Sequence, residues 1–338
     1  MAAIVFVFGF GVSHGPLLAT PPDQWDLRAE WDRRQPQHHF RGSTYSYAEL
    51  AQLREPENFA AEITLEVKAE RHGRCRKRVA ELAALLRRKD PDVLVIAGDD
   101  QREWILADLQ PAFTVFHGDS VTNLAFDAER AKEDPSVAYR MQATEPPGGD
   151  HVYPVQSDLA VHVIEQLGEE GFDVAASARQ PAGPDGPRQL GHAWGFVYRQ
   201  LLNDAPKPLV PVIVNTFYAP NRPTPKRCYQ LGRAIGRAIA GWESPKTVAV
   251  GGSGGLSHFV VDEPFDRALL EAMKEGDMAH IFALEDRLFR SGTSEIKNWL
   301  VAAGILAETD LEMQLLDYVP CYRSAAGTGC AMGFAAWT

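Results

Sequence analysis

Three histidines stand at positions where one catalytic site could use them together. His14 follows an apolar run, His192 opens another, and His258 ends the glycine-rich segment 251–258. A neutral imidazole can ligate a metal or act as a base near neutral pH, and an imidazolium can donate a proton. These residues therefore predict either a metal site or acid/base chemistry. A histidine that only packs, or that only forms a hydrogen bond in a loop, would fit the same positions.

Polar side chains also follow the apolar run at residues 92–97, in the segment Gly98-Asp99-Asp100-Gln101. Two adjacent carboxylates suggest a metal site, although acidic residues at a strand end often cap the next helix. Segment 251–258 lacks the lysine of a phosphate-binding loop, and its serine lies in Gly-Gly-Ser-Gly-Gly rather than in a G-x-S-x-G elbow. The glycines instead favour a close approach of the backbone to a small ligand.

Alternating apolar runs and amphipathic segments predict the elements that position these residues. Val/Ile-rich runs are typical of strands covered on both faces, and they occupy residues 4–10, 92–97, 209–214 and 247–250. Helical spacing of apolar residues predicts helices over residues 60–88, 157–168, 226–240, 266–274 and 294–303. The alternation predicts an α/β fold, a single domain over residues 1–338 with a mainly parallel sheet flanked by helices. Ligands bind beyond the carboxyl ends of such strands, where His14, Gln101 and His258 fall.

Two stretches, residues 21–58 and 127–153, interrupt this alternation. The first is rich in Arg, Asp, His and Tyr, and the second contains Pro146-Pro147-Gly148-Gly149. We expect both to be long loop insertions that act as lids, because long loops in compact domains are often functional.

Charge and composition exclude several classes of protein. The chain of 338 residues has 34 basic and 45 acidic side chains and a net charge of −11, which argues against binding of nucleic acid or of an anionic membrane surface. No apolar run reaches the roughly 18 residues of a membrane-spanning helix. The apolar start lacks the basic region and cleavage site of a signal peptide. The four cysteines form no C-x-x-C pair, so we expect reduced thiols, no zinc ribbon and a cytoplasmic protein.

Seven motifs follow one another along most of the chain. They are Ser13-His14-x-Pro16, residues 91–96 with 98–101, 211–216, 226–232, 251–258, 262–266, and 319–323 with 327–329. Their order resembles the class III (type II) extradiol ring-cleaving dioxygenases, a family that includes the catalytic (beta) subunit of protocatechuate 4,5-dioxygenase and gallate dioxygenase. The resemblance implies a non-haem Fe(II) held by two histidines and one glutamate, with positions open for a catechol and O₂.

The resemblance also implies a role for each of the three histidines. By position, His14 matches the first iron ligand, His258 the catalytic acid/base, and His192 a further catalytic-site histidine that contacts the substrate. The implied partners are a small aromatic substrate and O₂. Some relatives need a small companion subunit over the active site. We expect a homodimer here and no fused domain after Phe334. Either the two insertions take the place of the companion subunit, or a small companion subunit binds.

Two positions depart from the pattern of the family. Gln101 replaces the second iron histidine, and its carbonyl oxygen is a weaker ligand than an imidazole. The position of the glutamate falls on Pro264, which cannot bind a metal, but Glu263 stands beside it. A shift of one residue would bring Glu263 to the metal, and otherwise Glu263 caps a helix. We therefore expect His14 and Glu263 as metal ligands, with Gln101 and Asp100 as substrate-binding residues.

Three functions remain open at this point. The first is an Fe(II)-dependent extradiol dioxygenase that cleaves a catechol-like, carboxylated aromatic ring with His258 as acid/base. Two alternatives concern the metal. The site could bind another divalent metal, with Asp99 or Asp100 as a replacement carboxylate, or it could bind no metal at all. The second is a hydrolase, lyase or decarboxylase acting on a phenolic or cyclic diketone substrate through His14, His192 and His258. The third is a non-catalytic paralogue.

The first insertion offers side chains for a carboxylated aromatic substrate. We expect four arginines to bind the carboxylate: Arg28, Arg33, Arg34 and Arg41. Solvated surface arginines would fit these positions as well. We expect three aromatic residues to line the pocket: Trp25, Trp31 and Tyr45.

Overall fold

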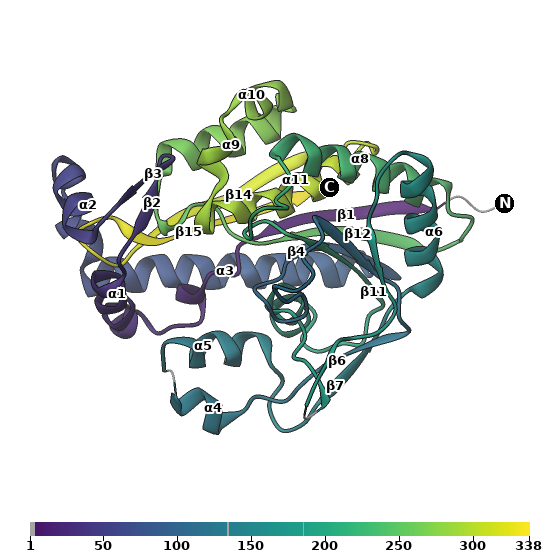
Figure 1. Cartoon of the computed structure of the whole chain (residues 1–338), viewed down its shortest axis with the longest axis horizontal. Helices are drawn as coiled ribbons and strands as arrows, with labels where there is room; N and C mark the ends of the chain where they lie inside the picture. Colours follow the sequence, from purple (N-terminus) through teal and green to yellow (C-terminus); the bar gives the residue numbers. More distant parts are fainter. Residues whose placement is uncertain (1–3, 134, 185) are drawn as a thin grey trace.

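A nine-stranded sheet runs through the centre of the computed structural model, which describes residues 4–133, 135–184 and 186–338. Its order is β13-β15-β1-β12-β4-β11-β5-β8, with β14 paired to β15, and helices cover both sides (Figure 1). Its strands are β1 (Val5–Val12), β4 (Val93–Asp99), β5 (Phe113–Phe116), β8 (Ala175–Ser177), β11 (Leu209–Val214), β12 (Thr247–Ser253), β13 (His258–Val260), β14 (Met313–Tyr322) and β15 (Thr328–Trp337).

The four inner strands β1, β12, β4 and β11 are parallel to one another. They correspond to the four apolar runs of the sequence, so the prediction of a mainly parallel sheet is confirmed. Alternate residues of β4 face opposite sides, and both sides are buried: Val93 and Val95 pack in one core cluster, Leu94 and Ile96 in the other. Burial on both faces explains why these strands are apolar throughout.

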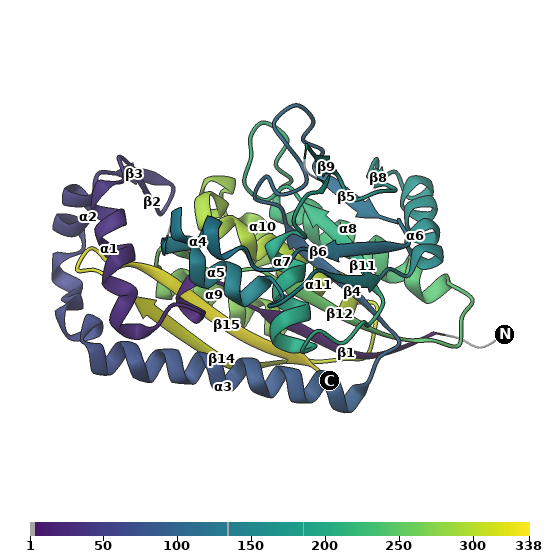
Figure 2. The same ribbon diagram turned by 90° about the horizontal axis from the view of Figure 1, so that it is seen from below.

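The helices divide between the two faces of the sheet. On one face lie α6 (Ser157–Glu169), α8 (Pro225–Gly241), α9 (Glu263–Glu275), α10 (Met278–Ala283) and α11 (Ile296–Leu306), and on the other lie α3 (Leu65–Lys89) and α7 (His192–Phe196). Figure 2 shows α3 running along β14 and β15. The five helices predicted from periodicity are confirmed as α3, α6, α8, α9 and α11, with ends shifted by a few residues.

The two insertions are largely folded segments rather than loops. The first contains α1 (Trp25–Arg34), the hairpin of β2 (His38–Phe40) and β3 (Ser43–Tyr45), and α2 (Tyr47–Leu53). The second contains α4 (Ala128–Glu133), α5 (Pro135–Thr144) and β7 (His151–Pro154), which pairs with β6 (Ser120–Asn123). Two signals for helices were present. Trp25, Ala29 and Asp32 lie at helical spacing and are buried, and Ser46 with Glu49 forms a capping box.

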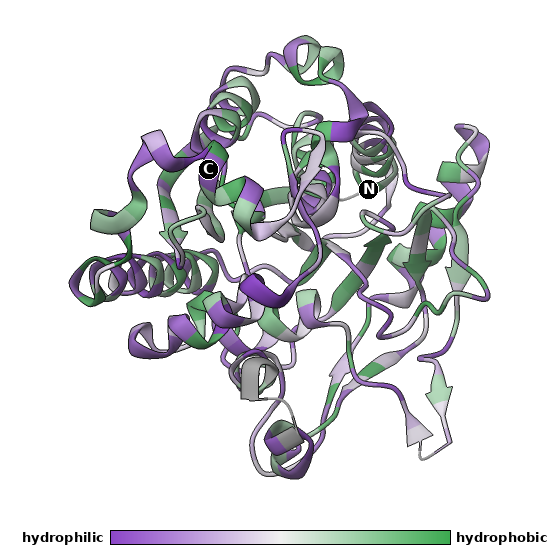
Figure 3. Cartoon of the chain, turned by 60° about the vertical axis from the view of Figure 1, so that its left-hand side comes forward, coloured by the Kyte–Doolittle hydropathy of each residue, from purple (hydrophilic) through white to green (hydrophobic). Residues whose placement is uncertain are grey.

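Hydrophobic residues gather on the inner strands, while hydrophilic residues gather on the outer helices and loops (Figure 3). A further small hairpin pairs β9 (Ala182–Gly183) with β10 (Gly186–Pro187). Within the described ranges, no helix combines the length and apolar character that crossing a membrane requires.

Candidate functional site

A cavity of about 250 Å³ lies beyond the carboxyl ends of the inner strands. His14, Gln101, His192 and His258, which the sequence singled out, all line it, together with Glu295. His14 follows the end of β1, where Val12 pairs with Ser253 of β12, and Gln101 follows the end of β4. The edge of the sheet predicted to hold the site therefore does bring these residues together.

His14 is held by a hydrogen bond that defines its tautomer. Its Nδ1 lies 2.9 Å from the hydroxyl oxygen of Ser253, and that hydroxyl donates its proton to the carbonyl of Ala193, also over 2.9 Å. Since the carbonyl only accepts, the hydroxyl must accept from His14 Nδ1–H. The Nε2 atom of a neutral His14 then carries a lone pair. This atom is buried and has no hydrogen-bond partner among the described residues.

Glu295 faces His14 from the opposite wall. It precedes the first residue of α11, and one carboxylate oxygen accepts a hydrogen bond from the Gly255 amide at 2.8 Å and lies 3.4 Å from His14 Nε2. The Gly255 position needs glycine, because a Cβ there would come within 2.8 Å of the His258 ring. Burial alone would raise the pKa of Glu295, but His258 and His14 beside it hold that pKa well below its ordinary value.

His258 offers both ring nitrogens to acceptors. Nδ1 donates to the carbonyl of Leu256 at 2.9 Å, and Nε2 lies 3.1 Å from the second carboxylate oxygen of Glu295. Burial opposes a charge on this ring, yet the pKa of His258 is raised because Glu295 lies beside it and accepts its hydrogen bond. A histidine at the cavity wall with such a partner can hold a proton and transfer it.

His192 is oriented by Glu103. The carboxylate of Glu103 lies 2.7 and 3.0 Å from His192 Nδ1 and also accepts from the His192 backbone amide. Burial disfavours the imidazolium, but Glu103 outweighs it and raises the pKa of His192 to about 9. Burial likewise disfavours a charged Glu103, and His192 lowers the pKa of Glu103 to about 2. Sequence reasoning did not find Glu103, because Arg102-Glu103 resembles an ordinary surface pair.

Asp99, the last residue of β4, is fully buried next to the cavity. Its two oxygens accept hydrogen bonds from the side-chain amides of Gln101 at 2.8 Å and Asn298 at 2.9 Å. Gln101 in turn accepts at its carbonyl oxygen from the Tyr218 hydroxyl, over 3.1 Å. Burial, together with the nearby charge of Glu295, raises the pKa of Asp99. Both ends of the Gln101 amide are therefore occupied in a network that reaches the cavity.

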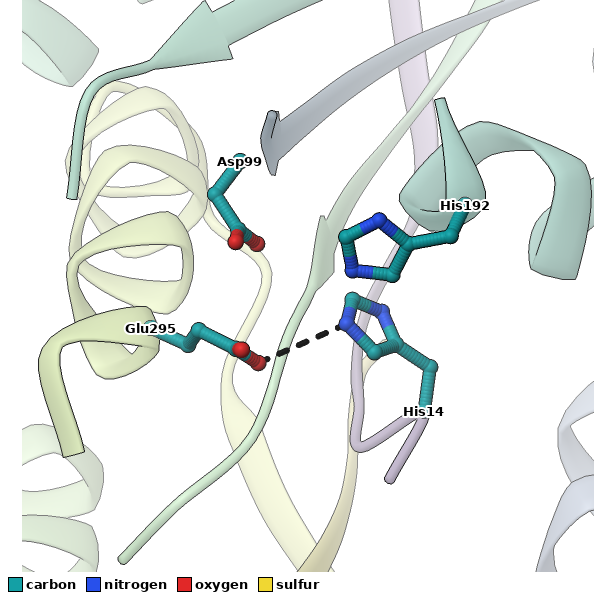
Figure 4. A group of neighbouring side chains, drawn as sticks. All are labelled: His14, Asp99, His192 and Glu295. Atoms are coloured by element: carbon teal, nitrogen blue, oxygen red, sulfur yellow. Dashed lines mark ion pairs between the residues drawn. The ribbon is translucent and has the colours of Figure 1, made fainter. Parts of the chain in front are cut away.

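Four of these buried side chains form a group that could hold a metal ion. One ligand atom from each of His14, Asp99, His192 and Glu295 lies within 4.8 Å of the others. Figure 4 shows the two histidines on one side of the group and the two carboxylates on the other. Two imidazoles with a carboxylate are a donor set that suits Fe(II). Among the described residues, none forms a hydrogen bond with Nε2 of His14, so its lone pair is available to a metal. The residues present therefore fit a metal.

Glu263 and Asp100 lie outside this group. The Glu263 carboxylate accepts from the Tyr322 hydroxyl at 2.9 Å and pairs with Arg267, in the first turn of α9. Asp100 accepts from the backbone amides of Trp104 and Ile105, which makes it a turn-capping residue. The structure thus brings His14 next to Glu295 and not next to Glu263. No pattern in the sequence marks Glu295 as special, because an acidic residue just before an apolar helix is common.

The side chains expected from the first insertion divide as well. Arg28 lines the cavity, whereas Arg41 pairs with Asp262 at 2.7 Å. The aromatic residues at the cavity are Phe217 and Phe259. The predicted aromatic residues lie elsewhere: Trp25 is buried in the core, Trp31 is half exposed, and Tyr45 packs in a small cluster with Leu50.

Comparison with known proteins places these residues in a family. Residues 77–328 match the family described as the catalytic LigB subunit of aromatic ring-opening dioxygenase. A gallate dioxygenase of Pseudomonas putida is 31% identical over 121 residues, covering 35% of this chain and 32% of the relative. A 2,3-dihydroxyphenylpropionate/2,3-dihydroxicinnamic acid 1,2-dioxygenase of Rhodococcus globerulus is 30% identical over 171 residues, covering 50% and 44%.

A protein of the same name from Photorhabdus laumondii is 29% identical over 181 residues, covering 53% of this chain and 46% of the relative. The chain thus spans less than half the length of each of these relatives. The family model, in contrast, covers most of the chain and includes every member of the metal-binding group except His14. The chain belongs to the family of LigB-type catalytic subunits of aromatic ring-opening dioxygenases.

Proposed function

We propose that the protein is a non-haem Fe(II)-dependent extradiol dioxygenase that cleaves the ring of a catechol-like, carboxylated aromatic compound. The observation that carries the proposal is the buried, unpartnered Nε2 of His14, which faces Glu295 at the wall of the cavity. A neutral imidazole nitrogen with no hydrogen-bond partner beside a carboxylate is unfavourable unless a cation joins them.

His14, His192 and Glu295 would hold the iron. Ser253 orients His14 and Glu103 orients His192 through the second ring nitrogen, as partners of metal-bound histidines commonly do. Bound Fe(II) would supply Lewis acidity and a path by which electrons pass from the dihydroxy ring, which is oxidised, to O₂, which is reduced. Without metal His192 is protonated, so binding of the metal would release a proton.

The other cavity residues act on the substrate in this proposal. In its neutral form, with the proton on Nδ1 bound to the Leu256 carbonyl, His258 would accept a proton from a substrate hydroxyl at Nε2 and return it later, and Glu295 would stabilise the protonated ring. Gln101 contacts the substrate, positioned by Tyr218 and Asp99. Phe217 and Phe259 supply apolar walls. A dry cavity of roughly 150 Å³ is enough to bind benzene, so about 250 Å³ has room for one substituted ring.

One observation favours a second function, acid/base catalysis without iron. Gln101 stands where the family has a histidine, and its amide is held by Asp99 and Tyr218 rather than directed at His14. His14, His192 and His258 would then act on a phenolic or cyclic diketone substrate as a hydrolase, lyase or decarboxylase does. The homodimer, the companion subunit and the cytoplasmic location stay predictions.

Metal analysis of protein purified without oxygen separates the two functions. We expect stoichiometric iron, and O₂ uptake when 3,4-dihydroxybenzoate or 2,3-dihydroxyphenylpropionate is added. H258A should keep the iron and lose about 10²–10⁴-fold in turnover, since that is the usual contribution of a general acid/base. H280A, at an exposed position of α10, is the matched control. Metal-free protein that still converts a phenolic substrate would contradict the dioxygenase proposal and support the second function.

A further inference from the structure

Two arginines reach the cavity from the two insertions. α1 brings Arg28 from the first insertion, and α5 brings Arg140 from the second. The segments are far apart in the sequence, and both arginines line the cavity. Arg28 precedes the region that matches the family model, which begins at residue 77. Half of this arginine pair is therefore supplied by a part of the chain that the family model does not describe.

The two guanidinium groups lie close enough to repel each other. The pKa of Arg28 is lowered to about 10, first because of burial, then because of the charges of Arg323 and Arg140. Arg140 also lies close enough to Glu103 and His192 to affect their pKa values. Two arginine charges thus reach the cavity, although the protein as a whole is acidic. Negative charge bound at this wall would be stabilised.

A buried ion pair holds the helix that carries Arg28. Asp32 lies one helical turn after Arg28 and is fully buried, and its carboxylate accepts two hydrogen bonds from Arg323, at 2.6 and 2.7 Å, and one from Thr328 at 2.5 Å. These bonds fix α1 to the start of β15, through Thr328, and to the end of β14, through Arg323. The position of Arg28 in the cavity wall is therefore set before any ligand binds, which lowers the entropy cost of binding.

We propose that Arg28 and Arg140 form a subsite for the carboxylate of a single-ring aromatic acid and that they select such acids over neutral aromatic compounds. A guanidinium binds a carboxylate through two parallel N–H donors, and its five donors allow it to serve several acceptors at once. Phe217 and Phe259 line the same cavity and would contact the ring. The subsite itself does not depend on the proposed function. Only the expectation that the bound ring carries hydroxyl groups, at which it is cleaved, rests on that function.

Binding of a ligand that cannot react tests this subsite. Full-length protein, as purified under argon, is titrated calorimetrically with 3-phenylpropionate and with its neutral amide. We expect the acid to bind at least about tenfold more tightly, since a hydrogen bond to a charged group contributes roughly 1.5–3 kcal/mol. R140M and R28M should each reduce the affinity for the acid by about 10–100-fold and leave the affinity for the amide unchanged.

Two further variants keep the result interpretable. Arg33, which the sequence also offered as a carboxylate binder, is exposed on the same helix and is not among the described residues that line the cavity. R33M should therefore bind the acid like the unchanged protein. R28K keeps the charge but loses the two-pronged geometry, so its affinity should lie between those of R28M and the unchanged protein even if R28M folds poorly. Equal affinity for acid and amide in the unchanged protein would overturn the proposal. So would a preference for the acid that survives in R28M and R140M, because the histidines would then be the carboxylate binders.

The titration is independent of turnover. Selective binding of the acid through Arg28 and Arg140, without O₂ consumption with any catechol, would support the subsite and contradict the dioxygenase proposal. Cleavage of catechols together with equal binding of acid and amide would support the dioxygenase proposal and contradict the subsite.

Discussion

The Nε2 atom of His14 lies 3.4 Å from a carboxylate oxygen of Glu295, and no described residue donates a hydrogen to it. The opposite ring nitrogen, Nδ1, donates to Ser253. An imidazole with Nδ1–H bound to a neighbour and a lone pair at Nε2 is the form in which histidine ligates metals. In the proposed function, the contact between His14 and Glu295 is where the metal ion would bind.

Replacement of Ser253 by alanine should weaken metal binding without removing a ligand. S253A loses the acceptor that fixes the His14 tautomer, so we expect the affinity for Fe(II), or for Co(II) as its probe, to fall about 10–100-fold. Competition with a chelator measures it. S157A removes a hydroxyl that bonds to the Gly118 carbonyl, far from the group, and should leave the affinity unchanged. Unchanged affinity in S253A would mean that Ser253 does not set the ligand tautomer.

A second pair of variants compares the glutamate at the cavity with the one expected from the sequence. E295Q replaces a carboxylate that faces His14, so purified E295Q should contain little iron. E263Q alters a residue bonded to Tyr322 and Arg267, so it should keep the iron content of the unchanged protein. Iron is measured per chain after anaerobic purification. Loss of iron in E263Q with retention in E295Q would restore the ligand set predicted from the sequence.

The inner strands could be predicted because their environment leaves a plain pattern. β1, β4, β11 and β12 are covered on both faces, which requires continuous apolar residues, and the polar residues that follow lie at one edge. That rule alone located His14, Gln101 and His258. The helices of the insertions were missed because their mostly polar sequences bury one narrow stripe, as α1 does with Trp25, Ala29 and Asp32.

The carboxylates of the site could not be predicted in the same way. Glu295 and Glu103 acquire their role from burial against His258, His14 and His192, which lie elsewhere in the sequence. Locally, Glu295 resembles an acidic residue that stabilises a helix N-terminus, and Glu263 does too. Only the packing of α11 against the ends of β12 and β4 distinguishes them.

Asp266 should give the protein a pH-dependent stability. It is fully buried and accepts hydrogen bonds from the Ser257 amide and hydroxyl and from the Tyr318 hydroxyl, yet burial outweighs these donors and raises its pKa from 3.8 to about 7. The folded protein therefore holds a proton that the unfolded chain releases above about pH 4. The free energy of unfolding should fall as the pH rises from about 4 to 7, by on the order of 2–4 kcal/mol from this group.

D266N removes this contribution, so comparison of its urea denaturation with that of the unchanged protein between pH 5 and pH 8 isolates it. The difference in stability should shift in favour of D266N as the pH rises. D310N, at an exposed position, should follow the unchanged protein. A constant difference between D266N and the unchanged protein would show that Asp266 is ionised throughout and that its three donors outweigh burial.

The contact between α8 and α11 sets the place of Glu295 and depends on glycine. A Cβ at Gly232 of α8 would overlap the carbonyl oxygen of Val301 and approach the backbone of Gly304, both in α11. G232A should therefore cost about 1–3 kcal/mol of unfolding free energy, because backbone atoms cannot move aside as a side chain can. G241A lies at the end of the same helix with nothing within 4 Å, and should be neutral or slightly stabilising.

Since the displaced α11 carries Glu295 at its start, G232A should also bind iron more weakly, whereas G241A should not. Equal stability and iron content in the two variants would show that α11 can shift without moving the carboxylate.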